Sequence, residues 1–227
     1  MKSAIVLCSG GLDSVTTAFY IKKRLKYKKI FILFFNYGQR TLAIERKFSK
    51  LCAKEVDADF LEIDIENLGK ISTSLLNSKK EHRRMKRGDL KDLREESEKW
   101  YVPCRNLVFL SYALALAESV NVKEKIDSYL FVGFKNEGRG GYPDTSQEFL
   151  DSLNKTARVS TIGKYKILAP LINKDKEDIV TLAKNLGVDF KKTFSCYTGS
   201  HKHCGTCLAC KLRQEGFYWA NVKDPTD

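Results

Sequence analysis

Apolar residues along the chain form short continuous runs, and between these runs they recur at helical spacing. A continuous apolar run of strand length is typical of a strand that is buried on both faces of a parallel sheet. The predicted strands cover residues 4–8, 30–35, 60–65 and 129–134. The helical patterns that follow them cover residues 15–21, 41–56, 107–119 and 174–186. Strands that alternate with helices in this way predict an α/β fold with a doubly wound parallel sheet.

Two helix boundaries can be predicted from capping residues. Thr145 is followed three residues later by Glu148, which is the pattern of a capping box, so we expect Thr145 to be the N-cap of the helix around residues 149–153. Gly187 directly follows the amphipathic run 174–186. Because glycine readily adopts the left-handed conformation that ends a helix, we expect that helix to stop there.

The turn after the first predicted strand reads Ser-Gly-Gly-Leu-Asp-Ser at residues 9–14. Adjacent glycines allow a tight turn and a close approach to a ligand, and the following helix directs free N–H groups and its positive end there. Ser9 and Ser14 add hydroxyl donors. This arrangement suits a phosphate or pyrophosphate. Asp13 would repel phosphates unless a cation lies between them, so the turn also predicts Mg²⁺.

The turn lacks the Gly-Lys-Ser/Thr of the Walker motif and the three spaced glycines of a dinucleotide site, and an ordinary strand–helix connection is the alternative. It resembles the pyrophosphate loop of the N-type ATP pyrophosphatases (the PP-loop superfamily), which adenylate a carbonyl oxygen or similar atom and release pyrophosphate. The resemblance implies an ATP site formed by Cys8, Ser9, Gly10, Gly11, Leu12, Asp13, Ser14, Tyr37, Gln39 and Arg40.

Composition and charge narrow the class of protein. The 227 residues are 43% hydrophobic and 30% charged, which is typical of a folded domain with one substantial core. We find no apolar run of membrane-spanning length and no signal peptide, so we expect a cytoplasmic protein with no membrane partner. A net charge of +12 permits an anionic partner such as a nucleic acid but does not require one.

A strongly charged excursion interrupts the alternation of strands and helices. From residue 79 to residue 99, 15 of 21 residues are charged, which predicts a mobile, solvated segment that is either a flexible insertion or a lid over the site.

We predict two parts of the chain. The first is a pyrophosphatase domain over residues 1–190, which includes a lid-like excursion at 78–100. A C-terminal extension follows at residues 191–227.

Four of the seven cysteines lie close together in the C-terminal extension. They are Cys196, Cys204, Cys207 and Cys210, in the spacing Cys-x7-Cys-x2-Cys-x2-Cys. Four thiolates complete the closed tetrahedral shell of a structural zinc ion, one per chain, which would hold together an extension too short to bury its own core. The alternatives are a [4Fe–4S] cluster, zinc bound by three cysteines with His201 or His203, and free thiols.

With these pieces placed, the chain resembles the 7-cyano-7-deazaguanine synthases, the QueC family of the same superfamily, nearly from end to end. The Gly-Tyr-Pro-Asp block and the cysteine block are more specific to this family than the pyrophosphate loop, which occurs throughout the superfamily. The matching motifs are at residues 9–14, 37–40, 102–106, 141–149, 169–171, 195–197 and 204–217.

The resemblance implies an enzyme that uses ATP and ammonia to convert 7-carboxy-7-deazaguanine to the nitrile preQ0 through adenylated intermediates, in queuosine or archaeosine biosynthesis. It also implies a homodimer. The implied catalytic residues are Asp13, Arg105 and Asp144. The implied substrate-binding residues are Arg105, Asn106, Tyr142 and Asp144: Asp144 would accept hydrogen bonds from the base, Arg105 would hold a carboxylate or phosphate, and Tyr142 would stack. The alternatives are a capping or turn role for Asp144 and a surface salt bridge for Arg105.

The sequence departs from the family pattern in one loop and at Cys104, where the family often has a small residue. Lys135, Gly138 and Gly140 stand where the family commonly has Asn, Asp and Ser, which leaves the base contacts open. One rival function is a PP-loop tRNA thiolase with a zinc or iron–sulfur site, in which Cys104 would be the sulfur carrier. The basic run at 79–87 favours it, although 227 residues leave no room for a separate RNA-binding domain. The other rival is a non-catalytic, zinc-stapled nucleotide-binding module.

Overall fold

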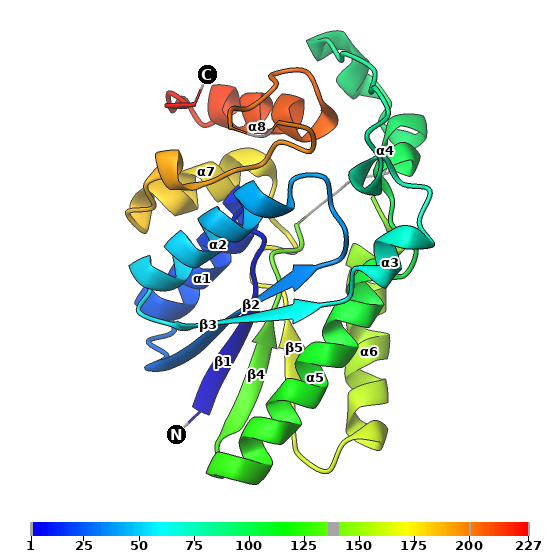
Figure 1. The fold of residues 1–227 in the computed structure, drawn as a ribbon. Coiled ribbons are helices and arrows are strands. Elements are labelled where there is room, and N and C mark those ends of the chain that lie inside the picture. Colours follow the sequence, from blue (N-terminus) through cyan, green and yellow to red (C-terminus); the bar gives the residue numbers. More distant parts are fainter. Residues whose placement is uncertain (1, 136–140, 200, 227) are drawn as a thin grey trace.

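The computed structural model describes residues 2–135, 141–199 and 201–226. Its centre is a five-stranded sheet with the order β3-β2-β1-β4-β5, and every pair of neighbouring strands is parallel (Figure 1). The strands are β1 (Lys2–Leu7), β2 (Lys29–Asn36), β3 (Asp59–Asp64), β4 (Asp127–Phe131) and β5 (Lys166–Leu168). The chain runs outward from β1 to β3 and then crosses to β4, so the order reverses between β1 and β4. The predicted doubly wound α/β fold is confirmed.

Helices cover both faces of the sheet (Figure 1). One face packs against α1 (Leu12–Lys23), α2 (Leu42–Glu55) and α7 (Lys176–Asn185), with Val15, Cys52 and Ile179 in the shared core. The other face packs against α5 (Arg105–Glu124) and α6 (Gln147–Ser160), with Leu110 and Leu150 in its core. The central strands carry apolar residues on both faces, which explains their uninterrupted hydrophobic runs.

The remaining elements are short, apart from the last helix. They are α3 (Asn67–Lys70), η1 (Leu75–Asn77), η2 (Arg87–Lys91), α4 (Arg94–Trp100), η4 (Pro143–Thr145), η5 (Phe190–Lys192) and α8 (Leu208–Trp219). Helix α8 lies beside α7, above the carboxyl ends of the strands in Figure 1. None of the helices in the described ranges is long and apolar enough to cross a membrane.

One predicted cap is wrong and the other is confirmed. The N-cap of α6 is Ser146, whose Oγ accepts a hydrogen bond from the Phe149 amide at 3.0 Å. Thr145 belongs to the preceding 3₁₀ turn, where its hydroxyl donates to the Tyr142 carbonyl at 2.9 Å. Pro143 fixes that turn, which moves the start of the helix by one residue. Gly187 has φ +71°, and it ends α7 as expected.

The charged excursion is less solvated than its composition predicts. Met85 and Glu96 are buried, at 3% and 4% exposure, and Trp100 at its end is 1% exposed. The Met85 amide donates to the Thr206 carbonyl at 2.9 Å, and the Glu96 carboxylate accepts from Trp100 Nε1 at 3.0 Å. A few apolar anchors and one satisfied carboxylate therefore tie the segment down, which a count of charges cannot reveal. The lid role and the domain division at residue 190 remain predictions.

Candidate active site

A cavity of about 300 Å³ lies at the carboxyl ends of β1, β2 and β4. This is the place where the strand order reverses, which is where open α/β sheets bind ligands. The predicted glycine turn forms one wall. Residues from the end of β2, the N-terminal end of α5 and the segment 194–197 form the others. The topology therefore brings together stretches that are far apart in the sequence.

The conformation of the glycine turn depends on close packing. Gly10 has φ +78°, and a Cβ there would lie 2.6 Å from the Cβ of Phe48 in α2, so only glycine fits. Gly11 is the N-cap of α1, and the Val15 amide is bonded to its carbonyl at 3.0 Å. The backbone N–H groups before Val15 have no carbonyl acceptor within the helix, as in the first turn of every helix. They are therefore available to bind an anion. Ser14 Oγ also donates to the Gly11 carbonyl at 3.0 Å, so this hydroxyl holds the turn itself.

Asp13 at the mouth of this turn is paired with a cation that sequence reasoning missed. Lys176 Nζ lies 2.8 and 2.7 Å from the two carboxylate oxygens, although the residues are 163 positions apart. Lys176 is the first residue of α7 and is partly buried, with 16% of its side chain exposed. Both side chains line the cavity. The positive charge that the loop requires beside Asp13 is therefore present within the chain.

Two glycines outside the turn at residues 9–14 allow the turn and Lys176 to pack closely against their neighbours. A Cβ on Gly133, just after β4, would lie 2.9 Å from the Ser14 nitrogen. A Cβ on Gly216 in α8 would lie 2.2 Å from the Cγ of Lys176. Both glycines permit contacts that any larger residue would prevent. In the sequence, Gly133 falls inside the predicted strand 129–134 and Gly216 inside the matching motif at 204–217, and neither was assigned this role.

The motif after β2 supplies the inner end of the cavity. The Gln39 side chain is clamped there: its oxygen accepts from the Tyr37 amide at 2.9 Å, and its nitrogen donates to the Phe35 carbonyl at 2.9 Å. Tyr37 and Gln39, two of the residues that the resemblance assigns to ATP, line the cavity. Arg40 does not; its guanidinium donates to the Lys80 carbonyl at 3.1 Å instead. Burial raises the pKa of the Tyr37 phenol, which therefore stays protonated at neutral pH.

Glu45 is a cavity residue that the motif analysis did not single out. It lies in the first turn of α2, and its carboxylate accepts from Thr41 Oγ1 and, at 3.2 Å, from Gln39 Nε2. Burial raises the pKa of the Glu45 carboxyl, while the hydrogen bonds from Thr41 and Gln39 and the charge of Arg105 act to lower it.

Arg105 projects from the first turn of α5 into the cavity. Its guanidinium lies over the rings of Tyr37 and Phe109, at 5.7 and 5.9 Å from their centres. Burial disfavours its charge, yet interactions with Tyr37 and Asp144 raise the pKa of Arg105 above its ordinary value. A permanently charged, planar group held against aromatic faces is suited to binding a carboxylate or a phosphate.

Asp144 and Asn106 hold each other, and Asp144 does not line the cavity. The Asp144 carboxylate accepts from the Asn106 amide at 3.1 Å, and the Asn106 side chain donates to the Asp144 carbonyl at 3.1 Å. This pair fastens the Gly-Tyr-Pro-Asp block to the start of α5, so the structure gives Asp144 the capping contact. Tyr142 does line the cavity, and its hydroxyl donates to the Ser97 carbonyl at 3.1 Å. Lys135 lines it too, whereas Gly138 and Gly140 lie outside the described residues.

The four predicted cysteine ligands come together in space. Their sulfur atoms all lie within 4.8 Å of one another, and among the residues that the structure describes this is the group of side chains that could hold a metal ion. Backbone N–H groups point at two of the sulfurs. Gly199 N lies 3.0 Å from Cys196 Sγ, and Cys207 N lies 3.2 Å from Cys204 Sγ. Donors aimed at sulfur stabilise thiolates, so the cluster fits a metal such as zinc.

Neither histidine of the segment belongs to this cluster. His203 Nε2 accepts a hydrogen bond from the Ser195 amide at 3.1 Å, and its ring lies 4.9 Å from that of Phe194. His201 is exposed and is outside the group of sulfur atoms. A third histidine, His82 in the charged excursion, places Nε2 4.0 Å from Cys204 Sγ. The geometry therefore favours four sulfur ligands over a mixed set.

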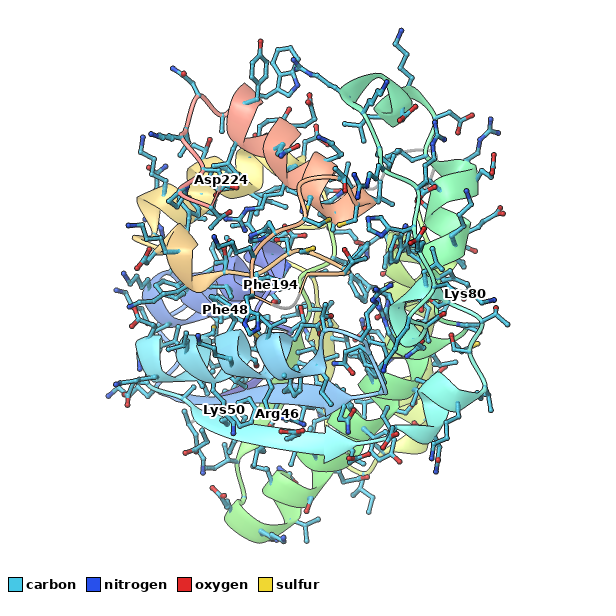
Figure 2. All side chains as sticks on the ribbon, turned by 45° about the horizontal axis from the view of Figure 1, so that its top comes forward. Arg46, Phe48, Lys50, Lys80, Phe194 and Asp224 are labelled. Atoms are coloured by element: carbon cyan, nitrogen blue, oxygen red, sulfur yellow. The ribbon has the colours of Figure 1, made fainter. Side chains whose placement is uncertain are left out.

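The cysteine segment is fastened directly to the glycine turn. The Phe194 amide donates to the Gly10 carbonyl at 2.9 Å, and the Phe194 ring stacks on Phe48 at 5.8 Å between centres (Figure 2). Arg213 of α8 is buried and bonds to Asp224 at 2.5 Å and to Thr193 Oγ1 at 2.8 Å. The cysteine cluster and α8 thus help to form the wall of the cavity that adjoins the turn.

Comparison with known proteins agrees with this arrangement. A family model described as "Queuosine biosynthesis protein QueC" matches residues 3–221. The 7-cyano-7-deazaguanine synthase of Methanobrevibacter smithii is 36% identical over 230 residues, covering 100% of this chain and 97% of that protein. Those of Rickettsia bellii and Clostridium kluyveri are each 38% identical, over 231 and 241 residues, covering 99% of this chain and 97% of theirs.

Two solved structures are more distantly similar. One is the U34-tRNA thiolase NcsA from Methanococcus maripaludis with its [4Fe–4S] cluster, at 18% identity and a TM-score of 0.47, covering 97% of this chain and 64% of that chain. The other is a 4-thiouridine synthetase in complex with RNA and ATP, at 16% identity and a TM-score of 0.48, covering 96% of this chain and 53% of that chain.

Proposed function

Because the chain belongs to the QueC family of queuosine biosynthesis proteins, we propose that it is an ATP-dependent 7-cyano-7-deazaguanine synthase. It joins ammonia to 7-carboxy-7-deazaguanine and dehydrates the product to the nitrile preQ0, a precursor of queuosine or archaeosine. The observation that carries this proposal is the shared cavity. One end has a pyrophosphate-loop turn with a cation, and the other has a charged guanidinium against aromatic rings.

The chemistry requires two activations. A carboxylate is a poor electrophile until one oxygen becomes a good leaving group, so ATP first adenylates it and pyrophosphate departs. Ammonia attacks the acyl carbon, the C–O bond to AMP breaks, and an amide forms. A second ATP adenylates the amide oxygen, and loss of AMP and of the nitrogen protons gives the nitrile. None of these steps needs a nucleophilic side chain; they need positioning and charge stabilisation.

The cavity offers residues for each part of this reaction. The turn at residues 9–14 and Lys176 hold the pyrophosphate, and Tyr37 and Gln39 shape the ATP site. Arg105 holds the substrate carboxylate, with Tyr142 as a nearby stacking face. Asp144 acts on substrate through Asn106 and the start of α5, whose position it fixes. Asp13 is the residue of the turn that would help to hold Mg²⁺, which would supply positive charge for the leaving pyrophosphate.

The other expectations from the family resemblance are also part of this proposal. One structural zinc per chain is held by the four cysteines, and the enzyme is a cytoplasmic homodimer. The excursion at 78–100 acts as a lid, which is supported by Leu93 and Ser97 in the wall of the cavity. Limited proteolysis tests the lid: cleavage within 79–99 should slow when an ATP analogue and substrate bind together. Equal cleavage with and without both ligands would contradict it.

The deciding experiment is mass spectrometry of 7-carboxy-7-deazaguanine incubated with the protein, ATP, Mg²⁺ and ammonium. We expect nitrile and AMP, with the Asp13→Asn variant as the control that forms far less of both. The rival tRNA thiolase predicts instead that sulfur enters tRNA and that Cys104→Ser abolishes it. Cys104 is exposed at the start of α5. Thiolation without nitrile formation would overturn the synthase proposal.

A further inference from the structure

The proposed reaction raises a problem that the residues assigned so far do not solve. Ammonia attacks as the free base, but in neutral water it is present mainly as ammonium, which has no lone pair. A site in the cavity that attracts the cation and accepts its proton would supply ammonia faster than the small neutral fraction in solution can. A carboxylate that is not already neutralised by a cation can do both.

The described wall of the cavity contains two carboxylates, Asp13 and Glu45. Both oxygens of Asp13 are bonded to Lys176 at 2.7–2.8 Å, at the end of the cavity where pyrophosphate departs. Glu45 accepts hydrogen bonds only from neutral donors among its described contacts, Thr41 and Gln39. Its charge is therefore left available to a cation, at the end of the cavity that holds Arg105.

Other titratable groups in the wall are unsuited to the task. The phenol of Tyr37 stays protonated, because burial raises its pKa. The Cys52 thiol lowers the pKa of the Cys8 thiol to about 7, but Cys8 is buried beneath the glycine turn and donates to Ser14 Oγ at 3.5 Å. Cys196 belongs to the sulfur cluster. No histidine lines the described wall.

We propose that Glu45 is a catalytic residue that binds ammonium and takes one proton from it, leaving ammonia beside the adenylated carboxylate. The inference rests on the proposed function. The step balances: one N–H bond of ammonium breaks, and the proton bonds to a Glu45 oxygen. The nitrogen lone pair then forms the C–N bond while the C–O bond to AMP breaks. The proton left over on the amide nitrogen passes to solvent, as does the proton on Glu45 before the next turnover.

The environment of Glu45 supports this role. Gln39, itself clamped to the backbone of β2, fixes the position of one carboxylate oxygen, and Thr41 fixes the other. The groups that influence its titration are Thr41 and Gln39 from the preceding turn, Arg105 from α5 and the Tyr37 phenol. Because burial raises the pKa of Glu45, its carboxylate is a stronger base than an exposed one, and proton transfer from ammonium is less uphill.

The test compares two nucleophiles in Glu45→Gln. Glutamine keeps the length of the side chain and a hydrogen-bonding oxygen but cannot accept the proton. We expect nitrile formation from ammonium at neutral pH to fall about 100-fold or more. Hydroxylamine is largely neutral at this pH and needs no such proton acceptor, so hydroxamate formation should stay within about 3-fold of wild type. Raising the pH should narrow the ammonium defect by about 10-fold per unit, because free ammonia increases.

Glu55→Gln is the matched control, a glutamate of the same helix that pairs with Lys192 at 2.8 Å outside the cavity. It should behave as wild type with both nucleophiles. If Glu45→Gln does not fold, Glu45→Asp keeps the charge on a shorter side chain and should raise KM for ammonium about 10-fold without raising KM for ATP.

Three outcomes would overturn the inference about Glu45. They are equal loss of nitrile and hydroxamate in Glu45→Gln, full activity of that variant with ammonium, and an ammonium defect that does not change with pH. A wild-type protein that forms neither product would instead overturn the proposed function. The two failures are therefore distinguishable.

Discussion

The glycine turn and the cysteine segment form adjoining walls of one cavity, but they are held in place in different ways. The turn, residues 9–14, is fixed between a buried strand and a helix, and its glycines are in contact with the backbone of neighbouring elements. The cysteine segment, residues 194–210, has little regular structure before α8 and is organised around four sulfur atoms. The turn is thus built by the core of the fold, and the cysteine segment by a cluster of four sulfur atoms that could hold a metal ion.

This difference shows where each wall is vulnerable. A charged residue of the turn can be substituted without unfolding the sheet, because the shape of the turn comes from its packing against β1, α1 and α2. The cysteine segment cannot lose a ligand without losing its organisation. The two walls meet at the bond between Phe194 and Gly10 and at the contact between Gly216 and Lys176. Disturbing the cysteine cluster should therefore alter the glycine turn and the position of Lys176 through these contacts.

The largest effect is expected from Cys207→Ser. The purified wild-type protein should be colourless with about one zinc per chain, and the variant should lose the metal. Its free energy of unfolding should fall by about 3–5 kcal/mol, or about 10 °C in Tm. Metal analysis and thermal unfolding check this, with Cys104→Ser as an exposed control outside the cluster. A brown protein with labile sulfide would show iron–sulfur binding instead.

Removing the cation at the turn comes next. Lys176→Met should lower kcat/KM for ATP about 100-fold or more, because a preorganised charge at the leaving pyrophosphate is lost. Asp13→Asn should have a comparable effect and should also reduce stability, since it leaves the partly buried Lys176 without its partner. The two losses should be less than multiplicative in the double variant. Lys184→Met, exposed at the other end of α7, is the control; a similar loss there would contradict the assignment.

Gly216→Ala tests the contact between the two walls. The added methyl group meets the Cγ of Lys176, so we expect kcat/KM for ATP to fall about 10-fold. Alanine is the better helix former by ~1 kcal/mol, which offsets part of the cost to stability. The decisive control is the same substitution in the Lys176→Met background, where it should add little. Gly88→Ala, where a Cβ meets nothing within 4 Å, should be silent. Equal loss in both backgrounds would refute the link through Lys176.

The smallest effect is expected where the charged excursion touches α8. Arg87 pairs with Glu215 at 2.7 Å and lies 4.2 Å from the centre of the Tyr218 ring. The Arg87 side chain is exposed and that of Glu215 is partly exposed, so Arg87→Ala should cost less than ~1 kcal/mol of unfolding free energy. Nitrile formation should stay within about 2-fold of wild type. Arg84→Ala, a neighbouring exposed residue, is the control in both measurements. A large loss of activity in Arg87→Ala would mean that the excursion does more than cover the site.

The sequence by itself determined the parallel sheet, the position of the glycine turn and the four cysteines that converge. These features are local: a buried strand must be continuously apolar, a tight turn must contain glycine, and Cys-x2-Cys brings two thiols to one point. The family resemblance added Tyr37, Gln39, Arg105 and Tyr142, all of which line the cavity.

Only the tertiary structure decided which charges meet. Lys176 reaches Asp13 across 163 positions, Met85 bonds to Thr206, and Asp144 turns to the start of α5 rather than into the cavity. No periodicity or spacing encodes such contacts, because they depend on how separate elements pack onto the sheet. The same holds for Glu45, an unremarkable residue on a helix until the fold buries it beside Arg105. Local patterns fix the scaffold, while burial and long-range contact set the charge of each group in the site.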